Sequence, residues 1–271
     1  MMKFIRLATI AALSTTILAG GAVAAFAQEV RDVTTDGQIE FRPAGEDDGD
    51  LEVLPPETDP DAPDVEIDPE VPGTTGPLSI VKAAHMNFGS QVISNQDQVY
   101  NMVAETARLT NPEEDGPTEV PYVSFAQVQD LRGTNAGWDL QVSLDDFTSN
   151  TQNNVLTGAE VGLMASRIQY EGTNAQNAPS NHADGLRLIP GAGAVSVMKA
   201  EEGQGAGASS VVWGNQADLN DQFANEDIDV VENDAIRLSV PGSTAKDATT
   251  YTSTLTWELT AIPGSDAGDA I

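Results

Sequence analysis

The fold class is decided by two short segments, WDLQVSL at residues 138–144 and LTWELTA at residues 255–261. In each segment apolar side chains alternate with polar ones, and successive side chains of a β-strand point to opposite faces. Trp and Leu of each segment therefore share one face. A buried tryptophan removes about 150–250 Å² from water, which is worth roughly 4–6 kcal/mol at 25 cal/mol per Å². We predict that both segments are strands and that they anchor a hydrophobic core.

From residue 78 onward the rest of the chain has the same β character. Short apolar alternations recur, separated by clusters of Gly, Asn, Asp, Ser and Pro that favour turns. These apolar positions are Leu78/Ile80, Phe125, Val161/Leu163/Ala165, Leu186/Leu188, Val195/Val197, Val211/Trp213 and Ile236/Leu238/Val240. This spacing predicts an all-β domain, either an antiparallel sandwich or a barrel-like fold. Helix is limited to residues 215–223 and residues 98–109, and the second segment fits a strand equally well.

The charge balance excludes several classes of partner. The 271 residues include 12 Lys+Arg and 42 Asp+Glu, which gives a net charge of -30 at pH 7. A chain this negative is repelled by nucleic-acid phosphates and by anionic membrane surfaces, so we expect no nucleic-acid partner. The chain has no cysteine, which excludes disulfides, a thiol nucleophile and cysteine-ligated zinc.

No motif in the sequence points to catalysis. His85 and His182 are the two histidines of the chain, and neither belongs to an H-E-x-x-H arrangement. Adjacent acids occur at residues 145–146, 201–202 and 226–229. A glycosidase needs two carboxyls that face each other across a cleft, and composition alone accounts for adjacent acids in so acidic a chain. We predict no enzyme activity, no catalytic residue, no cofactor and no metal site.

The first 27 residues have the features of a signal peptide. Lys3 and Arg6 precede an apolar stretch over residues 7–23, and residues 25–27 (AFA) fit the small-x-small cleavage pattern. Polar residues and glycines interrupt the apolar stretch, and it is shorter than the roughly 20 residues of a membrane span. We expect residues 1–27 to be removed on export, so that the mature chain begins at Gln28.

Residues 44–77 are acidic and rich in proline. Proline lacks the N–H that a strand needs and like charges repel, so we expect an extended, solvated linker or a loop of the domain. Before it, residues 28–43 end in the alternation of residues 38–41, which predicts a short N-terminal strand. After it, residues 78–271 form the main β-domain. The segment lacks the ligand spacing of a calcium loop, so a solvated linker is favoured over a calcium site.

Two Trp-x-Leu motifs occur in the chain, Trp138-Asp139-Leu140 and Trp257-Glu258-Leu259, and the second lies close to the C-terminus. With their surroundings they resemble the WxL-domain surface proteins of low-GC Gram-positive bacteria. Residues 236–246 with Leu255–Trp257 look like the C-terminal signature of that family, and residues 35–41 with residues 76–80 look like its N-terminal portion. The resemblance covers nearly the whole mature chain, as in small stand-alone members.

The resemblance implies a secreted, non-catalytic protein that attaches non-covalently to the bacterial cell wall through peptidoglycan. It also implies a surface complex with other WxL-type proteins and a membrane-anchored partner, and some relatives contact host matrix proteins. The C-terminal sequence shows no hydrophobic tail and no Leu-Pro-x-Thr-Gly sorting motif, so we expect a non-covalent hold at the cell surface. The alternative function is a protein-interaction subunit that a partner holds there instead of glycan.

The tryptophans themselves have two interpretations, core residues or a platform on which sugar rings stack. Trp138 and Trp257 each share a face with leucine and further apolar side chains, which favours the core and leaves Asp139 and Glu258 exposed. Trp213 ends an apolar run beside a turn. The sequence leaves it equally a core residue and a semi-exposed candidate binding aromatic.

Overall fold

The structure is a computed structural model that describes residues 37–43, 52–56, 64–69 and 71–261. The predicted signal peptide, residues 1–27, lies outside the described residues. Residues 37–40 belong to a separate unit from the chain that begins at Phe41. The strand expected at residues 38–41 is not formed, and Ile39 and Phe41 are 76% and 85% exposed. An extended segment becomes a strand only when a neighbouring strand satisfies its backbone groups, which alternation alone does not supply.

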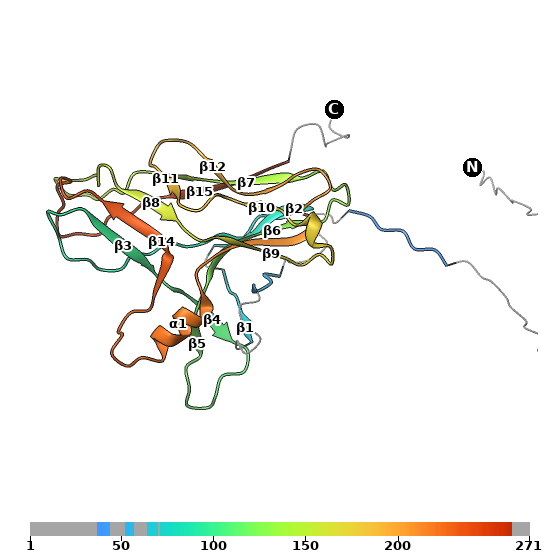
Figure 1. The fold of residues 1–271 in the computed structure, drawn as a ribbon, viewed down its shortest axis with the longest axis horizontal. Coiled ribbons are helices and arrows are strands. Elements are labelled where there is room, and N and C mark those ends of the chain that lie inside the picture. Colours follow the sequence, from blue (N-terminus) through green and yellow to red (C-terminus); the bar gives the residue numbers. More distant parts are fainter. Residues whose placement is uncertain (1–36, 44–51, 57–63, 70, 262–271) are drawn as a thin grey trace, which may run out of the picture. The chain divides into compact units, whose positions relative to one another are not determined.

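The prediction of an all-β class is confirmed. The described residues contain fifteen strands, the helix α1 (Gln216–Phe223) and the 3-10 turn η1 (Ala175–Asn177). The strands form three four-stranded sheets and one three-stranded sheet, and every pairing is antiparallel (Figure 1). We call the three-stranded sheet A and the four-stranded sheets B, C and D; their strands are given below.

Sheet D contains both tryptophan strands, and they are direct neighbours. Across the sheet the order is β10 (Ser180–Asn181), β12 (Val195–Ala200), β7 (Trp138–Leu144) and β15 (Leu255–Ala261). Strands β7 and β15 run antiparallel with Leu140 opposite Leu259 and Val142 opposite Trp257. Strand β7 is therefore paired on both sides, whereas β15 is an edge strand.

Sheets B and C share one hydrophobic core with sheet D. The order in sheet B is β2 (Leu78–Lys82), β6 (Ser124–Asp130), β13 (Gly207–Trp213) and β9 (Arg167–Tyr170). The order in sheet C is β11 (Leu186–Leu188), β8 (Glu160–Leu163), β14 (Glu232–Val240) and β3 (Gln98–Val103). The shared core includes Trp138 and Leu140 of sheet D, Val211 and Trp213 of sheet B, and Ile236 of sheet C.

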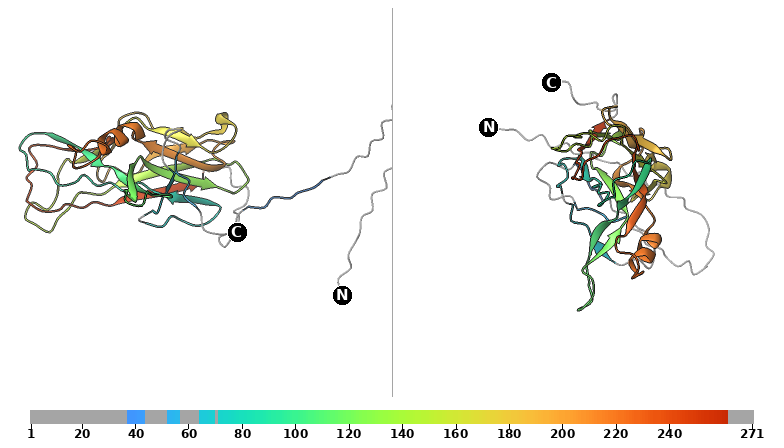
Figure 2. Two further views of the ribbon diagram at one scale, coloured as in Figure 1. Left: turned by 90° about the horizontal axis from the view of Figure 1, so that it is seen from below. Right: turned by 90° about the vertical axis from the view of Figure 1, so that its left-hand side faces the viewer.

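A second hydrophobic cluster covers the opposite face of sheet B. Sheet A, in the order β1 (Val65–Glu66), β4 (Glu105–Leu109) and β5 (Glu119–Tyr122), contributes to it. Phe125 and Val212 of sheet B pack there with Ala107 and Tyr122 of sheet A and with Leu219 of α1. The helix and sheet A extend to the same side of the molecule in Figure 1 and in the right-hand view of Figure 2. Strands β6 and β13 are consequently buried on both faces.

The described parts of the acidic, proline-rich segment lie against the domain. Val53 is 8% exposed and belongs to the second cluster. Gln127, buried in β6, accepts a hydrogen bond from Leu54 N at 3.0 Å and donates one to Leu54 O at 2.7 Å. The Tyr122 hydroxyl donates to Pro56 O at 2.6 Å. Val53, Leu54 and Pro56 therefore pack on the domain.

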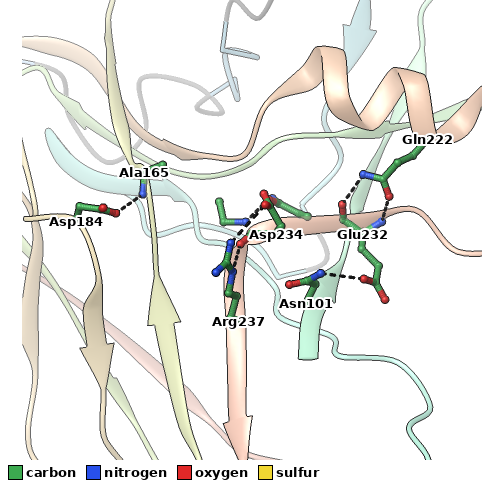
Figure 3. A network of polar contacts seen from close by, with 9 residues as sticks. Asn101, Ala165, Asp184, Gln222, Glu232, Asp234 and Arg237 are labelled. Atoms are coloured by element: carbon green, nitrogen blue, oxygen red, sulfur yellow. Dashed lines mark hydrogen bonds and ion pairs between the residues drawn. The ribbon is translucent and has the colours of Figure 1, made fainter. Parts of the chain in front are cut away.

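The two helix candidates differ in outcome. Residues 215–223 form α1 with Asn215 as its N-cap, as predicted, while residues 98–109 form the strands β3 and β4. The helix is tied to the start of β14 by Gln222, which donates to Glu232 O and accepts from Glu232 N, both at 2.9 Å (Figure 3). A glutamine side chain offers both a donor and an acceptor, so Gln222 satisfies the backbone N–H and C=O of Glu232 together.

Trp138 is fully buried, and a glycine turn closes over its ring. The indole Nε1 donates to Gly205 O at 3.1 Å. Gly205 has φ +74°, and a Cβ there would stand 2.6 Å from Nε1 of Trp138. Only glycine combines this backbone conformation with this close approach.

We expect Gly205→Ala to lower the free energy of unfolding by about 2–5 kcal/mol, because left-handed backbone strain adds to a clash with the indole. Gly203→Ala is the matched control, since Gly203 also has a positive φ, +87°, but has nothing within 4 Å of its Cβ position. Gly203→Ala should lower the free energy of unfolding only through the left-handed backbone strain, by about 1–2 kcal/mol. Urea unfolding of the two variants measures the difference, and equal losses would contradict the packing described for Trp138.

Candidate functional site

A groove of about 950 Å³ is lined by residues of sheets A, B and D. Its walls include the edge strands β2 and β15, the central strand β4 of sheet A, and the backbone over residues 71–74. Grooves of this size that combine apolar walls with a few polar groups are typical of ligand sites. It contains a residue of the second Trp-x-Leu motif, Trp257.

The two motif tryptophans lie in different environments. Trp138 is fully buried, as the core interpretation predicts. Trp257 packs against the same core, with its ring centroid 6.4 Å from that of Trp213, but it is only half-buried and its side chain also lines the groove. Strand β7 has a neighbour on each side and β15 has one, so Trp257 keeps a side that no strand covers.

The remaining motif residues divide between the core and the surface. Leu140 is buried and Leu259 is half-buried against the core. Glu258 is exposed as expected. Asp139 is half-buried rather than exposed, because Ser196 Oγ donates to its carboxylate at 2.5 Å and Gln141 Nε2 at 2.7 Å.

Trp213 is a core residue and not a semi-exposed aromatic, since its side chain is fully buried. Its indole Nε1 donates to His182 Nε2 at 2.9 Å, and the two rings stack with centroids 6.0 Å apart. The sequence could not decide between the alternatives because the residue that covers Trp213 is 31 positions away along the chain.

A buried ion pair forms the polar floor of the groove. Lys82 Nζ lies 3.0 Å from Glu105 Oε1, and the two side chains are 7% and 18% exposed. The same ammonium donates to Phe125 O at 3.3 Å and lies 4.3 Å from the centroid of the Phe125 ring. Such a charge is tolerated inside a protein only when it is paired and hydrogen-bonded. Glu105 Oε2 is buried and has no hydrogen-bond partner among the described residues.

The other acids of the groove are also engaged. Arg108 binds Glu66 Oε2 at 2.9 Å and Asp68 Oδ2 at 3.0 Å, and Thr106 Oγ1 donates to Glu119 Oε2 at 3.2 Å. These contacts are solvent-exposed, so each contributes little to stability. The groove therefore combines one half-buried indole with side chains of both charges that are paired with one another.

Hydrogen bonds between two loops fix the chain just before β15, beside the groove. Tyr251 donates from its hydroxyl to Asn153 O at 2.6 Å and accepts from Asp247 N at 3.0 Å. Asn153 donates to the Asp247 carboxylate from its backbone N at 2.8 Å and from Nδ2 at 2.7 Å. These bonds lower the pKa of Asp247. They hold the chain just before Ser253 and Thr254, which line the groove.

Sequence reasoning missed the polar residues of this groove. Lys82 carried one indication, since it is the first basic residue after Arg42 and directly follows the apolar residues Ile80 and Val81. Glu105 carried none, because strand pairing and not sequence spacing brings it to Lys82. The acid pairs at residues 145–146 and 201–202 and the run at residues 226–229 are not among the lining residues.

Two further properties concern the described residues only. No group of three or more His, Cys, Asp or Glu side chains there is placed to hold a metal ion. Within the same residues, no helix combines the length and hydropathy that a membrane span requires.

A comparison with known protein families gives one match. The family model described as "WxL domain surface cell wall-binding" matches residues 28–263. No curated protein and no solved structure matches the chain.

We expect Lys82→Met to lower the free energy of unfolding by about 3–5 kcal/mol, because it leaves the Glu105 carboxylate buried without its counter-ion. Arg108→Met removes an exposed cation from the same groove and should lower it by less than about 1 kcal/mol. Urea unfolding of both variants tests the assignment. If Lys82→Met and Arg108→Met lower the free energy of unfolding by similar amounts, the Lys82–Glu105 pair is not buried as described.

Proposed function

The chain belongs to the WxL family of surface cell wall-binding domains, and on that premise we propose that it is a secreted, non-catalytic protein that attaches non-covalently to peptidoglycan. In this proposal residues 1–27 direct export and are removed. The mature chain then consists of residues 28–43, an acidic, proline-rich linker or loop over residues 44–77 and the main β-domain over residues 78–271. The Gram-positive cell surface is the proposed location.

The observation that carries the proposal is the position of Trp257 at the groove. The apolar face of a sugar ring stacks on an aromatic side chain, and its hydroxyls donate to carboxylates. The half-buried indole of Trp257 offers such a face, and polar and charged side chains line the same groove. The contact of Trp213 in sheet B with Trp257 in sheet D also supports a sandwich arrangement of these two sheets.

The state of the acids in the groove supports a non-catalytic role. Hydrolysis of a glycosidic bond needs one carboxyl as an acid and a second as a nucleophile or base. In this groove Glu105 is paired with Lys82, Asp68 is paired with Arg108, and Glu119 accepts a hydrogen bond from Thr106. Each acid is therefore engaged in a structural contact.

One observation favours the second candidate, a subunit that a membrane-anchored or WxL-type partner holds at the surface. Strand β15 borders the groove and is a sheet edge. An edge strand presents unpaired backbone N–H and C=O groups, to which an extended segment of a partner can add as a further strand.

For the peptidoglycan proposal we predict that Trp257→Ala abolishes co-sedimentation of the mature chain with purified peptidoglycan. Thr256→Ala is the matched control on the same strand, because Thr256 is exposed and does not line the groove. Trp138→Ala should instead lose about 3–5 kcal/mol of stability. Thermal unfolding recorded in parallel separates loss of binding from loss of fold.

Three results would count against this proposal. If folded Trp257→Ala sediments like the unchanged chain, the groove is not the binding site. If the unchanged chain is retained by cells that carry a surface partner but not by bare peptidoglycan, the second candidate is correct. Release of muropeptides during prolonged incubation would show that the protein is an enzyme.

Charge gives a separate prediction for intact walls. Wall teichoic acids are polyanions, so they repel a chain of net charge -30, and salt screens this repulsion. Binding to intact walls should strengthen as NaCl rises from about 0.05 M to about 0.5 M, over which the Debye length falls from more than about 10 Å to less than about 5 Å. Walls stripped of teichoic acid should show a smaller change. Binding that weakens with salt would instead indicate a direct contact with a basic side chain.

A further inference from the structure

His182 is held in one protonation state by two contacts. Its Nδ1 lies 2.7 Å from Ala183 O, and its Nε2 accepts the hydrogen bond from Trp213 Nε1 at 2.9 Å. A carbonyl oxygen only accepts and an indole N–H only donates, so Nδ1 carries the proton and Nε2 carries the lone pair. The imidazole is therefore neutral in this arrangement, and it stacks on the indole at an interplanar angle of 25°.

The surroundings of His182 contain one charged group that acts on it, Asp184 of the same loop. Asp184 Oδ1 is itself fixed by Ala165 N at 2.7 Å (Figure 3). The strands packed on the histidine contribute Trp213 from β13 and the carbonyl of Val197 from β12, which accepts from His182 N at 3.1 Å, and neither group titrates. Burial lowers the pKa of His182 and outweighs the opposite effects of the Ala183 bond and Asp184.

We propose that His182 is a proton-operated latch on Trp213. When Nε2 takes up a proton, two N–H donors face each other, and the buried indole loses its acceptor. A buried donor without a partner is strongly unfavourable, so the imidazolium must turn or leave the ring of Trp213. The latch is closed when His182 is neutral and opens when it is protonated.

The direction of the pH dependence follows from the lowered pKa. The unfolded chain binds a proton at His182 more readily than the folded chain does. The latch therefore contributes fully to stability above about pH 6.5, the ordinary pKa of histidine, and its contribution is lost as the pH falls below that value.

The contact between His182 and Trp213 is connected to the groove through Trp257. Trp213 packs on Trp257, and Trp257 lines the groove. Opening the latch therefore frees one neighbour of the groove indole, so wall binding should change over the same pH range as His182. This consequence rests on the proposed function, whereas the latch itself does not.

The test follows the indole N–H signals of the three tryptophans by NMR between about pH 7.5 and pH 5, above the range in which ordinary carboxylates protonate. The Trp213 signal, assigned with Trp213→Phe, should shift with a midpoint below about pH 6.5. His182→Gln keeps an acceptor for the indole but does not titrate, so the shift should vanish. His85→Gln alters the other histidine of the chain and should leave the shift unchanged.

A Trp213 signal that titrates equally in His182→Gln, or that stays constant in the unchanged chain, overturns the proposal. Imidazole ¹⁵N shifts of the unchanged chain give a result that needs no variant. They should show Nδ1–H at about pH 7.5, and the Nε2–H form overturns the latch. Wall binding is recorded separately: if the indole signal titrates and binding does not, the latch stands and its effect on the groove fails.

Discussion

Strands β6 and β13 are buried on both faces, and the rest of the structure depends on this constraint. A strand alternates its side chains, so one row must meet one core and the next row another. Val211 and Trp213 point into the core shared with sheets C and D, while Phe125 and Val212 point into the cluster under sheet A. Sheets C and D pack on one face of sheet B, and sheet A, α1 and Val53 of the acidic segment pack on the other.

The groove follows from the same arrangement. Sheet A covers one face of sheet B and sheet D shares the core on the other, and the edge strands β2 and β15 each have a strand neighbour on one side only. Lys82 at the end of β2 is drawn into this space by Glu105, and Trp257 on β15 keeps an uncovered side. Trp138 and Trp257 occupy the same position in the same motif, yet strand order gives one of them a structural role and leaves the other accessible.

The sequence predicted what depends on local alternation. It predicted the strands β7 and β15, the helix over residues 215–223 and the burial of Trp138, because these depend on the local order of apolar and polar residues. It could not predict that β15 is an edge, that His182 caps Trp213 or that Glu105 meets Lys82, because these depend on strand order. The strand expected at residues 38–41 was wrong for the same reason: alternation predicts a strand, but a strand forms only where a neighbouring strand pairs with it.

The central claim is that Trp257, and not Trp138, contacts the cell wall. It is tested most directly by titrating the mature chain with a soluble peptidoglycan fragment and following the three indole N–H signals by NMR. The account predicts that the Trp257 signal shifts in a saturable manner while the Trp138 signal, whose N–H is bound to Gly205 O in the core, does not move. Saturable binding that leaves the Trp257 signal in place would contradict it.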